Sequence, residues 1–97
     1  MKIKVKIITP NGLFVDGKEY TSVYLQTVDG DMTVLPKHSP LVSTLRIGTV
    51  TLTNDSEKTY LHVHRGLVKI DGELKIITER LYLVDENGVK IQTPSHL

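Results

Sequence analysis

Hydrophobic and polar residues alternate along most of this chain, and short turn-forming pairs interrupt the alternation at close intervals. Ile3, Val5 and Ile7 alternate with lysines, so an extended segment there would bury one face and leave the lysines on the other. No segment shows convincing helical periodicity. The turn-forming pairs, which tolerate positive φ and favour tight hairpins, are Asn11-Gly12, Asp16-Gly17, Asp29-Gly30, Asn54-Asp55, Asp71-Gly72 and Asn87-Gly88. The pattern predicts an all-β sandwich or barrel.

The same alternation predicts where the strands lie. Besides residues 3–7, the expected strands are residues 20–27, 32–35, 49–53, 59–64, 67–70 and 73–78. In the first of these, one row of side chains is Val23 and Leu25, and the other is Tyr20, Ser22, Tyr24 and Gln26. We expect residues 40–45 to form no more than a short turn. Residues 81–93 are expected to form a hairpin around Glu86-Asn87-Gly88, with a frayed end beyond it.

Composition restricts the function classes that remain. A chain of 97 residues fits one domain, residues 1–97, and 39% hydrophobic content is enough for one core. The net charge of +1 gives no field that would attract nucleic acid or an anionic bilayer. Without cysteine there is no disulfide, thiolate chemistry or cysteine zinc site. No apolar run approaches the length of a membrane span, and the N-terminus lacks the apolar block of a signal peptide. We therefore expect a cytoplasmic chain that reaches a membrane only through a partner.

The most constrained segment is a proline-rich loop that contains a histidine. Pro36 and Pro40 fix their own φ and lack an N–H, so a strand must stop near Leu35 and a stiff loop must follow. That loop presents His38. A general base would need an orienting carboxylate, and none is adjacent in the sequence. Two interpretations remain open for His38: a hydrogen bond that holds the loop, and contact with a partner.

Other candidate sites have simpler explanations. His62 and His64 share one face of an expected strand, as metal-binding histidine pairs do, but no acidic residue follows them closely. Turn chemistry accounts for the isolated aspartates better than calcium binding does. Gly66 interrupts two strands, which indicates a bulge or a close backbone approach, and it places Arg65 at a bend where a partner could reach it. No catalytic, cofactor or metal site is predicted.

Several segments, in the right order, resemble one family. The proline-rich segment Gly30–Val42, with its Leu-Pro-x-His-Ser-Pro core, resembles the signature of the ε subunit of bacterial F-type ATP synthases. Supporting matches are residues 7–10, 45–48, 64–68 and 74–79. The likeness covers roughly residues 1–80. It implies a β-sandwich of about ten short strands, mostly antiparallel, at the foot of the central stalk.

The resemblance also implies a mechanical function with no catalysis and no cofactor. Such a subunit would bind the γ subunit and the c-type rotor ring, and would couple ion translocation to ATP synthesis or hydrolysis at the cytoplasmic face of the membrane. The positions that match the family's γ contacts are Thr9, His38, Ser39, Leu41, Thr44, His64 and Arg65. The positions that match its ring-facing acidic loop are Asp29, Gly30 and Asp31. An aspartate on a turn can accept charge-assisted hydrogen bonds from basic loops.

The chain also departs from the family pattern. Where family members continue into a C-terminal helical hairpin, residues 81–91 are strand-like, so regulation by such a hairpin is not expected. The chain is either a naturally short subunit or a fragment, and the strand-like residues 87–91 favour a natural ending over a cut within a helix. Thr33 and Arg65 replace family glycines. Two alternative functions stay open: a small metal-binding β-sandwich that uses His62 and His64, and a free-standing adaptor.

Overall fold

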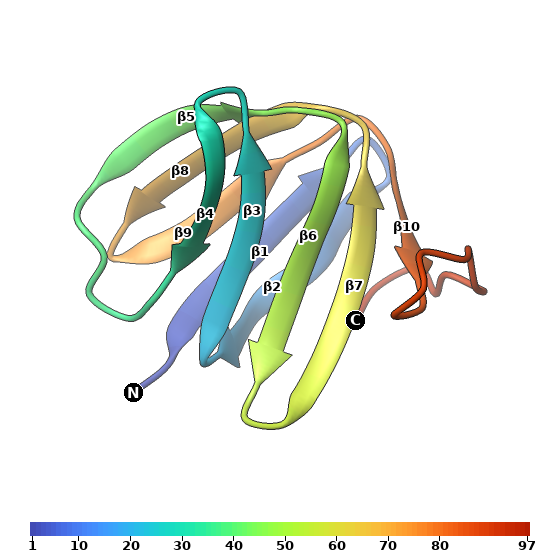
Figure 1. The fold of residues 1–97 in the computed structure, drawn as a ribbon, viewed down its shortest axis with the longest axis horizontal. Coiled ribbons are helices and arrows are strands. Elements are labelled where there is room, and N and C mark those ends of the chain that lie inside the picture. Colours follow the sequence, from blue (N-terminus) through green and yellow to red (C-terminus); the bar gives the residue numbers. More distant parts are fainter.

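The computed structural model describes residues 1–97 and contains ten strands and no helix (Figure 1). The strands are β1 (Ile3–Thr9), β2 (Gly12–Tyr20), β3 (Ser22–Thr27), β4 (Gly30–Val34), β5 (Leu41–Leu45), β6 (Gly48–Asn54), β7 (Glu57–Val63), β8 (Gly66–Asp71), β9 (Glu73–Ile77) and β10 (Leu81–Val84). The all-β prediction is confirmed. No helix of the structure is long and apolar enough to span a membrane.

The strands form one sheet that curls over on itself into two layers. Hydrogen bonding runs in the order β10-β7-β6-β3-β5-β8-β9-β1-β2, and β4 pairs with the free side of β3. We call β4, β3, β6, β7 and β10 the front sheet, and β5, β8, β9, β1 and β2 the back sheet (Figure 1). The two sheets join at one corner through a single residue pair, Thr27 with Leu45. Only β1 and β9 pair in parallel.

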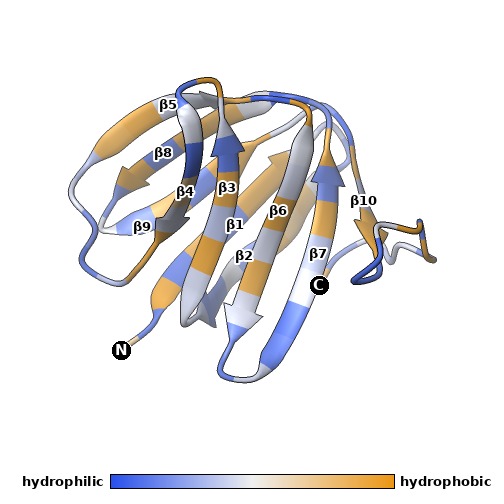
Figure 2. Cartoon of the chain, in the orientation of Figure 1, coloured by the Kyte–Doolittle hydropathy of each residue, from blue (hydrophilic) through white to orange (hydrophobic).

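The core lies between the two layers because the alternation is respected in nearly every strand. Ile3, Val5 and Ile7 are buried, whereas Lys2 and Lys4 of the same segment are exposed. Figure 2 shows hydrophobic and hydrophilic residues alternating along the strands. Each large side chain moved from water into this core contributes about 1.5–3 kcal/mol to folding.

Five connections gather at one end of the sandwich, along the upper edge of Figure 1. Main-chain hydrogen bonds tie them together, from Val28 to Thr44, from Thr78 to Ile8 and from His64 to Arg80. We call this region the turn end; it comprises residues 9–12, 27–31, 44–48, 64–66 and 78–80. The β4–β5 loop and the N-terminus lie at the opposite end.

Two strands were not predicted, and both have a physical reason. Residues 41–45, expected to form no more than a turn, form β5, since Pro40 ends the preceding loop and β8 offers a pairing edge from Leu41 to Leu45. Residues 12–20 form β2, and the expected turn at Asp16-Gly17 is wrong. Gly17 has no partner across from it in β1, with Lys6 opposite Asp16 and Val5 opposite Lys18, so the pair forms a bulge within the strand.

Two details of the predicted rows also differ. Tyr20 is 3% exposed and belongs to the core, not to the outward row of Tyr24, because β2 ends at Tyr20 and β3 begins only at Ser22. Its hydroxyl has no hydrogen-bond partner, and burial raises the pKa of the Tyr20 phenol. The expected 81–93 hairpin is reduced to β10 and one bridge, Val84 with Lys90.

The C-terminal residues cross the open side of the sandwich instead of fraying. The Ile91 amide donates to the Leu83 carbonyl over 3.0 Å, and the Leu97 amide donates to the Phe14 carbonyl over 2.7 Å. The first contact is with the front sheet and the second with the back sheet. The segment therefore links the two layers on the side away from the Thr27–Leu45 corner.

Candidate functional site

Two turns at the turn end share one local design, a threonine three residues before a glycine. In Thr9–Gly12 and in Thr27–Gly30, the threonine Oγ1 donates to the glycine carbonyl, over 3.1 and 2.8 Å. The same Oγ1 accepts the amide of the intervening Asn11 or Asp29. The glycines have φ of 114° and 126°, which other residues rarely adopt. These bonds fix the shape of both turns and hold the predicted Asp29 in place.

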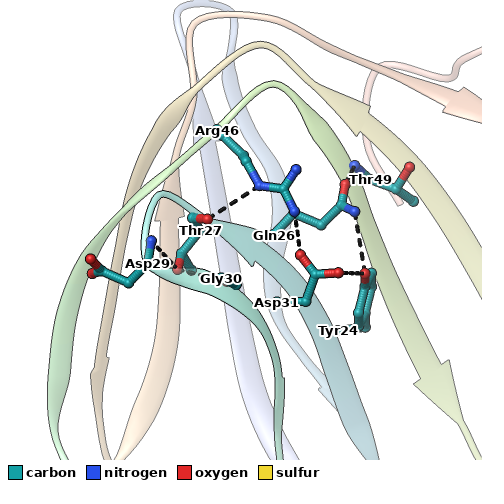
Figure 3. A network of polar contacts seen from close by, with 8 residues as sticks. All are labelled: Tyr24, Gln26, Thr27, Asp29, Gly30, Asp31, Arg46 and Thr49. Carbon is teal, nitrogen blue, oxygen red and sulfur yellow. Dashed lines mark hydrogen bonds and ion pairs between the residues drawn. The ribbon is translucent and has the colours of Figure 1, made fainter.

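The β3–β4 turn carries a polar network centred on Asp31 (Figure 3). The Tyr24 hydroxyl donates to Asp31 Oδ2 over 2.6 Å, and Arg46 forms an ion pair with Asp31 Oδ1. Arg46 Nε also donates to the Thr27 carbonyl over 3.2 Å. Gln26 extends the network, since its Nε2 donates to Tyr24 and its Oε1 accepts the Thr49 amide. Arg46, which lies in the β5–β6 connection, thus holds the β3–β4 turn at the end of the front sheet in place.

The two predicted acidic residues of this turn therefore differ in availability. Asp31 has both carboxylate oxygens engaged within the chain. Asp29 is exposed, and its carboxylate points away from the network in Figure 3. Of the two, Asp29 is the one whose carboxylate is free to meet another molecule.

The network also sets two pKa values. The hydrogen bond from Tyr24, together with Arg46, holds the pKa of the Asp31 carboxyl below its ordinary value, and partial desolvation opposes this only in part. The same hydrogen bond to Asp31 raises the pKa of the Tyr24 phenol. Both directions follow from one fact: the bond requires an ionised carboxylate and a protonated phenol.

This arrangement predicts a pH-dependent contribution of Asp31 to stability. A carboxyl with a depressed pKa in the folded state stabilises above its unfolded pKa of about 3.9 and loses that contribution as pH falls through the folded value. We expect urea unfolding to show D31N less stable than the parent chain at pH 6, with the difference shrinking as the pH falls below the unfolded pKa of about 3.9. A difference that stays constant over this range would contradict the network's role.

The β7–β8 turn is shaped by a close backbone approach at Gly66, as predicted. A Cβ at Gly66 would lie inside contact distance of the Ile77 carbonyl oxygen and 3.2 Å from Thr78 Cα. Thr78, itself buried, donates through Oγ1 to the Arg65 carbonyl over 2.7 Å. Arg65 is exposed and has φ of 58°. Its Nη2 forms an ion pair with Glu79 Oε1 over 3.8 Å. Its backbone is therefore fixed, while its guanidinium projects from the bend.

An open hollow of about 320 Å³ lies beside this bend. Its lining residues are His64, Arg65, Gly66, Leu67 and Glu79. A larger hollow of about 770 Å³ lies next to Thr9, between the β1–β2 turn and residues 93–95. Thr9, Thr44, His64 and Arg65 are thus brought to the same end as Asp29, Gly30 and Asp31.

The proline-rich loop lies at the opposite end. The His38 amide donates to the Leu35 carbonyl over 3.2 Å, and Lys37 has φ of 67°, so Pro36 and Lys37 occupy the centre of a tight turn. His38 Nδ1 lies 2.7 Å from the Ser39 carbonyl, which makes Nδ1 the protonated nitrogen. The adjoining hollow holds only about 40 Å³, below the roughly 300–1,000 Å³ of small-molecule sites.

The predicted γ contacts therefore fall into two groups. His38 and Ser39 precede β5, Leu41 begins it, and Thr44 lies near its end at the turn end. Strand β5 connects the two groups along one side of the back sheet.

His62 and His64 do lie close together, with ring centroids 5.7 Å apart. The His62 ring stacks on the Tyr82 ring of the neighbouring strand, with the two centroids 5.0 Å apart. Lys90 Nζ lies over the same Tyr82 ring, 4.8 Å from its centroid. No group of three or more histidine, cysteine, aspartate or glutamate side chains is arranged to hold a metal ion. The pair is packed as part of the β7–β10 surface.

Sequence reasoning missed the residues that hold Asp31. Tyr24 and Gln26 were placed together on one face, but nothing pointed to their contact with Asp31. The Thr27–Gly30 turn sets Gln26 opposite Asp31, whereas a two-residue turn centred on the Asp29-Gly30 pair would have set Val28 there. Nothing in the sequence marked Arg46 as a partner of Asp31, because Arg46 reaches Asp31 only through the corner where the two sheets meet.

Comparison with known proteins gives one consistent result. Residues 2–92 match the family described as ATP synthase, delta/epsilon chain, beta-sandwich domain. The ATP synthase epsilon chain of Alkalihalophilus pseudofirmus is 37% identical over 68 residues, which cover 70% of this chain and 50% of that one. The epsilon chain of Thermotoga maritima is 36% identical over 78 residues, covering 79% and 71%. The match thus spans only half the length of the first relative.

Solved structures show the same fold. A chain in the Euglena gracilis mitochondrial ATP synthase structure of OSCP, F1 and c-ring has a TM-score of 0.83 at 18% identity, covering 88% of this chain and 55% of that chain. A chain in the Tetrahymena thermophila central stalk and c-ring structure has a TM-score of 0.74 at 17% identity, covering 84% and 66%. The sandwich prediction is confirmed by both.

Proposed function

This chain belongs to the ATP synthase delta/epsilon β-sandwich family, and on that premise we propose that it is a non-catalytic subunit of the central stalk that binds the γ subunit and the c-type rotor ring. In this role it couples ion translocation to ATP synthesis or hydrolysis without chemistry of its own. It works at the membrane surface, on the cytoplasmic face, through the complex that holds it.

One observation carries the proposal. The turn end collects Thr9, Thr44, His64 and Arg65, proposed to contact γ, beside Asp29–Asp31, proposed to contact the ring. A subunit that joins two partners must present both sets of contacts on one body, and here the threonine turns and the Arg46–Asp31 ion pair fix their relative positions.

The two contact regions suit different partners. Asp29 is a free carboxylate on a fixed turn, which suits charge-assisted hydrogen bonds from basic or polar loops of the ring. The proposed γ contacts begin at His38, Ser39 and Leu41, reach Thr44 near the end of β5, and continue to Arg65. Thr44 is exposed, whereas the Leu41 side chain packs partly against the core. The proline-rich loop is already ordered by its own bonds, so docking γ there costs less conformational entropy.

The experiment is titration of purified γ from the same organism into single variants. R65A and H38A probe the two ends of the proposed contact, and E86A, exposed on the β10 side, is the control. We expect each test variant to weaken γ binding about tenfold, equivalent to about 1.4 kcal/mol, and the control to bind normally. All three should unfold like the parent chain in circular dichroism. Parental affinity in both test variants would refute this assignment of γ contacts.

A further inference from the structure

The outer face of the back sheet carries an apolar row that crosses four strands beside the turn end. Cross-strand pairing places Leu67 next to Ile77, Ile77 next to Ile8, and Ile8 next to Leu13. Leu67, Ile77 and Leu13 are 52%, 48% and 43% exposed, and Ile8 is half-buried. Such a continuous line of exposed aliphatic side chains is a feature of interaction surfaces, whereas single exposed apolar residues are ordinary.

A row of lysines runs parallel to the apolar row, one step further from the turn end on the same face. Lys69 pairs with Lys75, and Lys75 pairs with Lys6. Like charges directly opposite each other in a sheet are destabilising. None of the three lysines forms an ion pair within the chain, so only more distant carboxylates on the same face offset part of the repulsion. An anionic group from outside the chain would remove this cost.

The remaining charges on the face argue against a membrane as the anionic group. Asp16 lies directly opposite Lys6, and Asp71 and Glu73 lie just beyond Lys69 and Lys75 on the same strands. An anionic bilayer would meet these carboxylates together with the lysines. The face also lacks the tryptophan and tyrosine side chains that anchor proteins at a bilayer. A partner narrower than a bilayer surface, with negative charge along one side only, could cover the apolar row and the lysine row without meeting Asp71 and Glu73.

We propose that this face binds an amphipathic α-helix of the γ subunit that lies across β8, β9, β1 and β2, with its apolar side on Leu13, Ile8, Ile77 and Leu67 and acidic residues facing Lys6, Lys69 and Lys75. Strands are about 4.8 Å apart and a helix rises about 1.5 Å per residue, so the apolar row matches about ten residues of helix. That the partner is the γ subunit rests on the proposed function. That the binding element is an amphipathic helix rests on the apolar row and the lysine row.

The first test reverses the lysine row. K69E/K75E is titrated with γ beside K18E/K58E, which makes the same change in net charge on exposed lysines elsewhere. We expect K69E/K75E to lower the affinity for γ at least about tenfold and to reduce its dependence on salt, while the control pair binds like the parent chain. L67S/I77S should lower the affinity with its salt dependence unchanged.

The second test identifies the element that binds. The chain has no cysteine, so a single one in L13C or in L67C can carry a photocrosslinker without side reactions. We expect the two positions to crosslink to γ residues about ten apart on the same side of one helix.

The outcomes separate this inference from the proposed function. If the parent chain does not bind γ at all, the proposed function fails. If γ binds but K69E/K75E has parental affinity, or if the two crosslinks fall in different elements of γ, the helix proposal is overturned while the proposed function stands. Binding of the parent chain to phosphatidylglycerol vesicles that K69E/K75E abolishes, without an effect on γ, would likewise overturn the proposal in favour of a lipid surface.

Discussion

Replacing Gly66 with alanine is expected to lower the free energy of unfolding by about 3 kcal/mol, at the upper end of what overpacking usually costs. The new Cβ would press on the Ile77 carbonyl oxygen and approach Ile77 C and Thr78 Cα at 3.2 Å. All three atoms are backbone, so no side-chain rotation relieves the contact. Relief requires β8 to move away from β9, which strains the ladder from Leu67 to Asp71.

Urea unfolding of G66A beside G72A measures this effect. Gly72 also has a positive φ, 77°, but nothing lies within 4 Å of its Cβ position. G72A should therefore show only the conformational cost, about 1–2 kcal/mol. Equal losses in the two variants would mean that the contact with Ile77 does not matter and that only backbone conformation is being measured.

Truncating Leu45 to alanine is expected to have a comparable effect, about 3 kcal/mol. Leu45 is fully buried where the front and back sheets meet, opposite Thr27 on one side and Gly66 on the other. The cavity left by the truncation would lie at the corner, where the neighbouring turns are held by hydrogen bonds and cannot easily close around it.

The matched control for this prediction is L67A, on the adjacent strand of the same sheet. Leu67 is 52% exposed, so its truncation should change the free energy of unfolding by no more than about 0.5 kcal/mol. Thermal or urea unfolding of both variants distinguishes them. A loss in L45A no larger than that in L67A would show that the corner repacks and does not depend on Leu45.

Much of this fold could be predicted because hydrophobic and polar residues alternate locally along most strands. The rows Ile3, Val5, Ile7 and Val23, Leu25 are buried as expected, since a two-residue period needs no knowledge of the partner strand. Strand β2 was missed because bulges at Phe14 and Gly17 break that period, which puts Phe14 and Val15 in the core side by side.

The candidate site was less predictable because it depends on contacts between distant segments. Glycines such as Gly30 and Gly66 show where the chain must bend or approach itself closely, and both interpretations were correct. The partners of Asp31 were not foreseeable, since Arg46 reaches it only after β5 has crossed from one sheet to the other. The separation of His38 from Arg65 likewise follows from the direction of β5, which the sequence did not mark as a strand.

The sparse links between the two sheets have a mechanical consequence. Main-chain bonds connect the layers near Thr27 and Leu45 on one side and at Leu97 and Phe14 on the other, while the interior between them is held by interlocking aliphatic side chains. Shear that slides one layer over the other is therefore resisted chiefly by close packing, which is stiff over short displacements. A load that enters through the back sheet and leaves through the β3–β4 turn can cross at the Thr27–Leu45 corner, through the Arg46–Asp31 ion pair or through the packed interior. The stiffness of the sandwich therefore depends on these three links together.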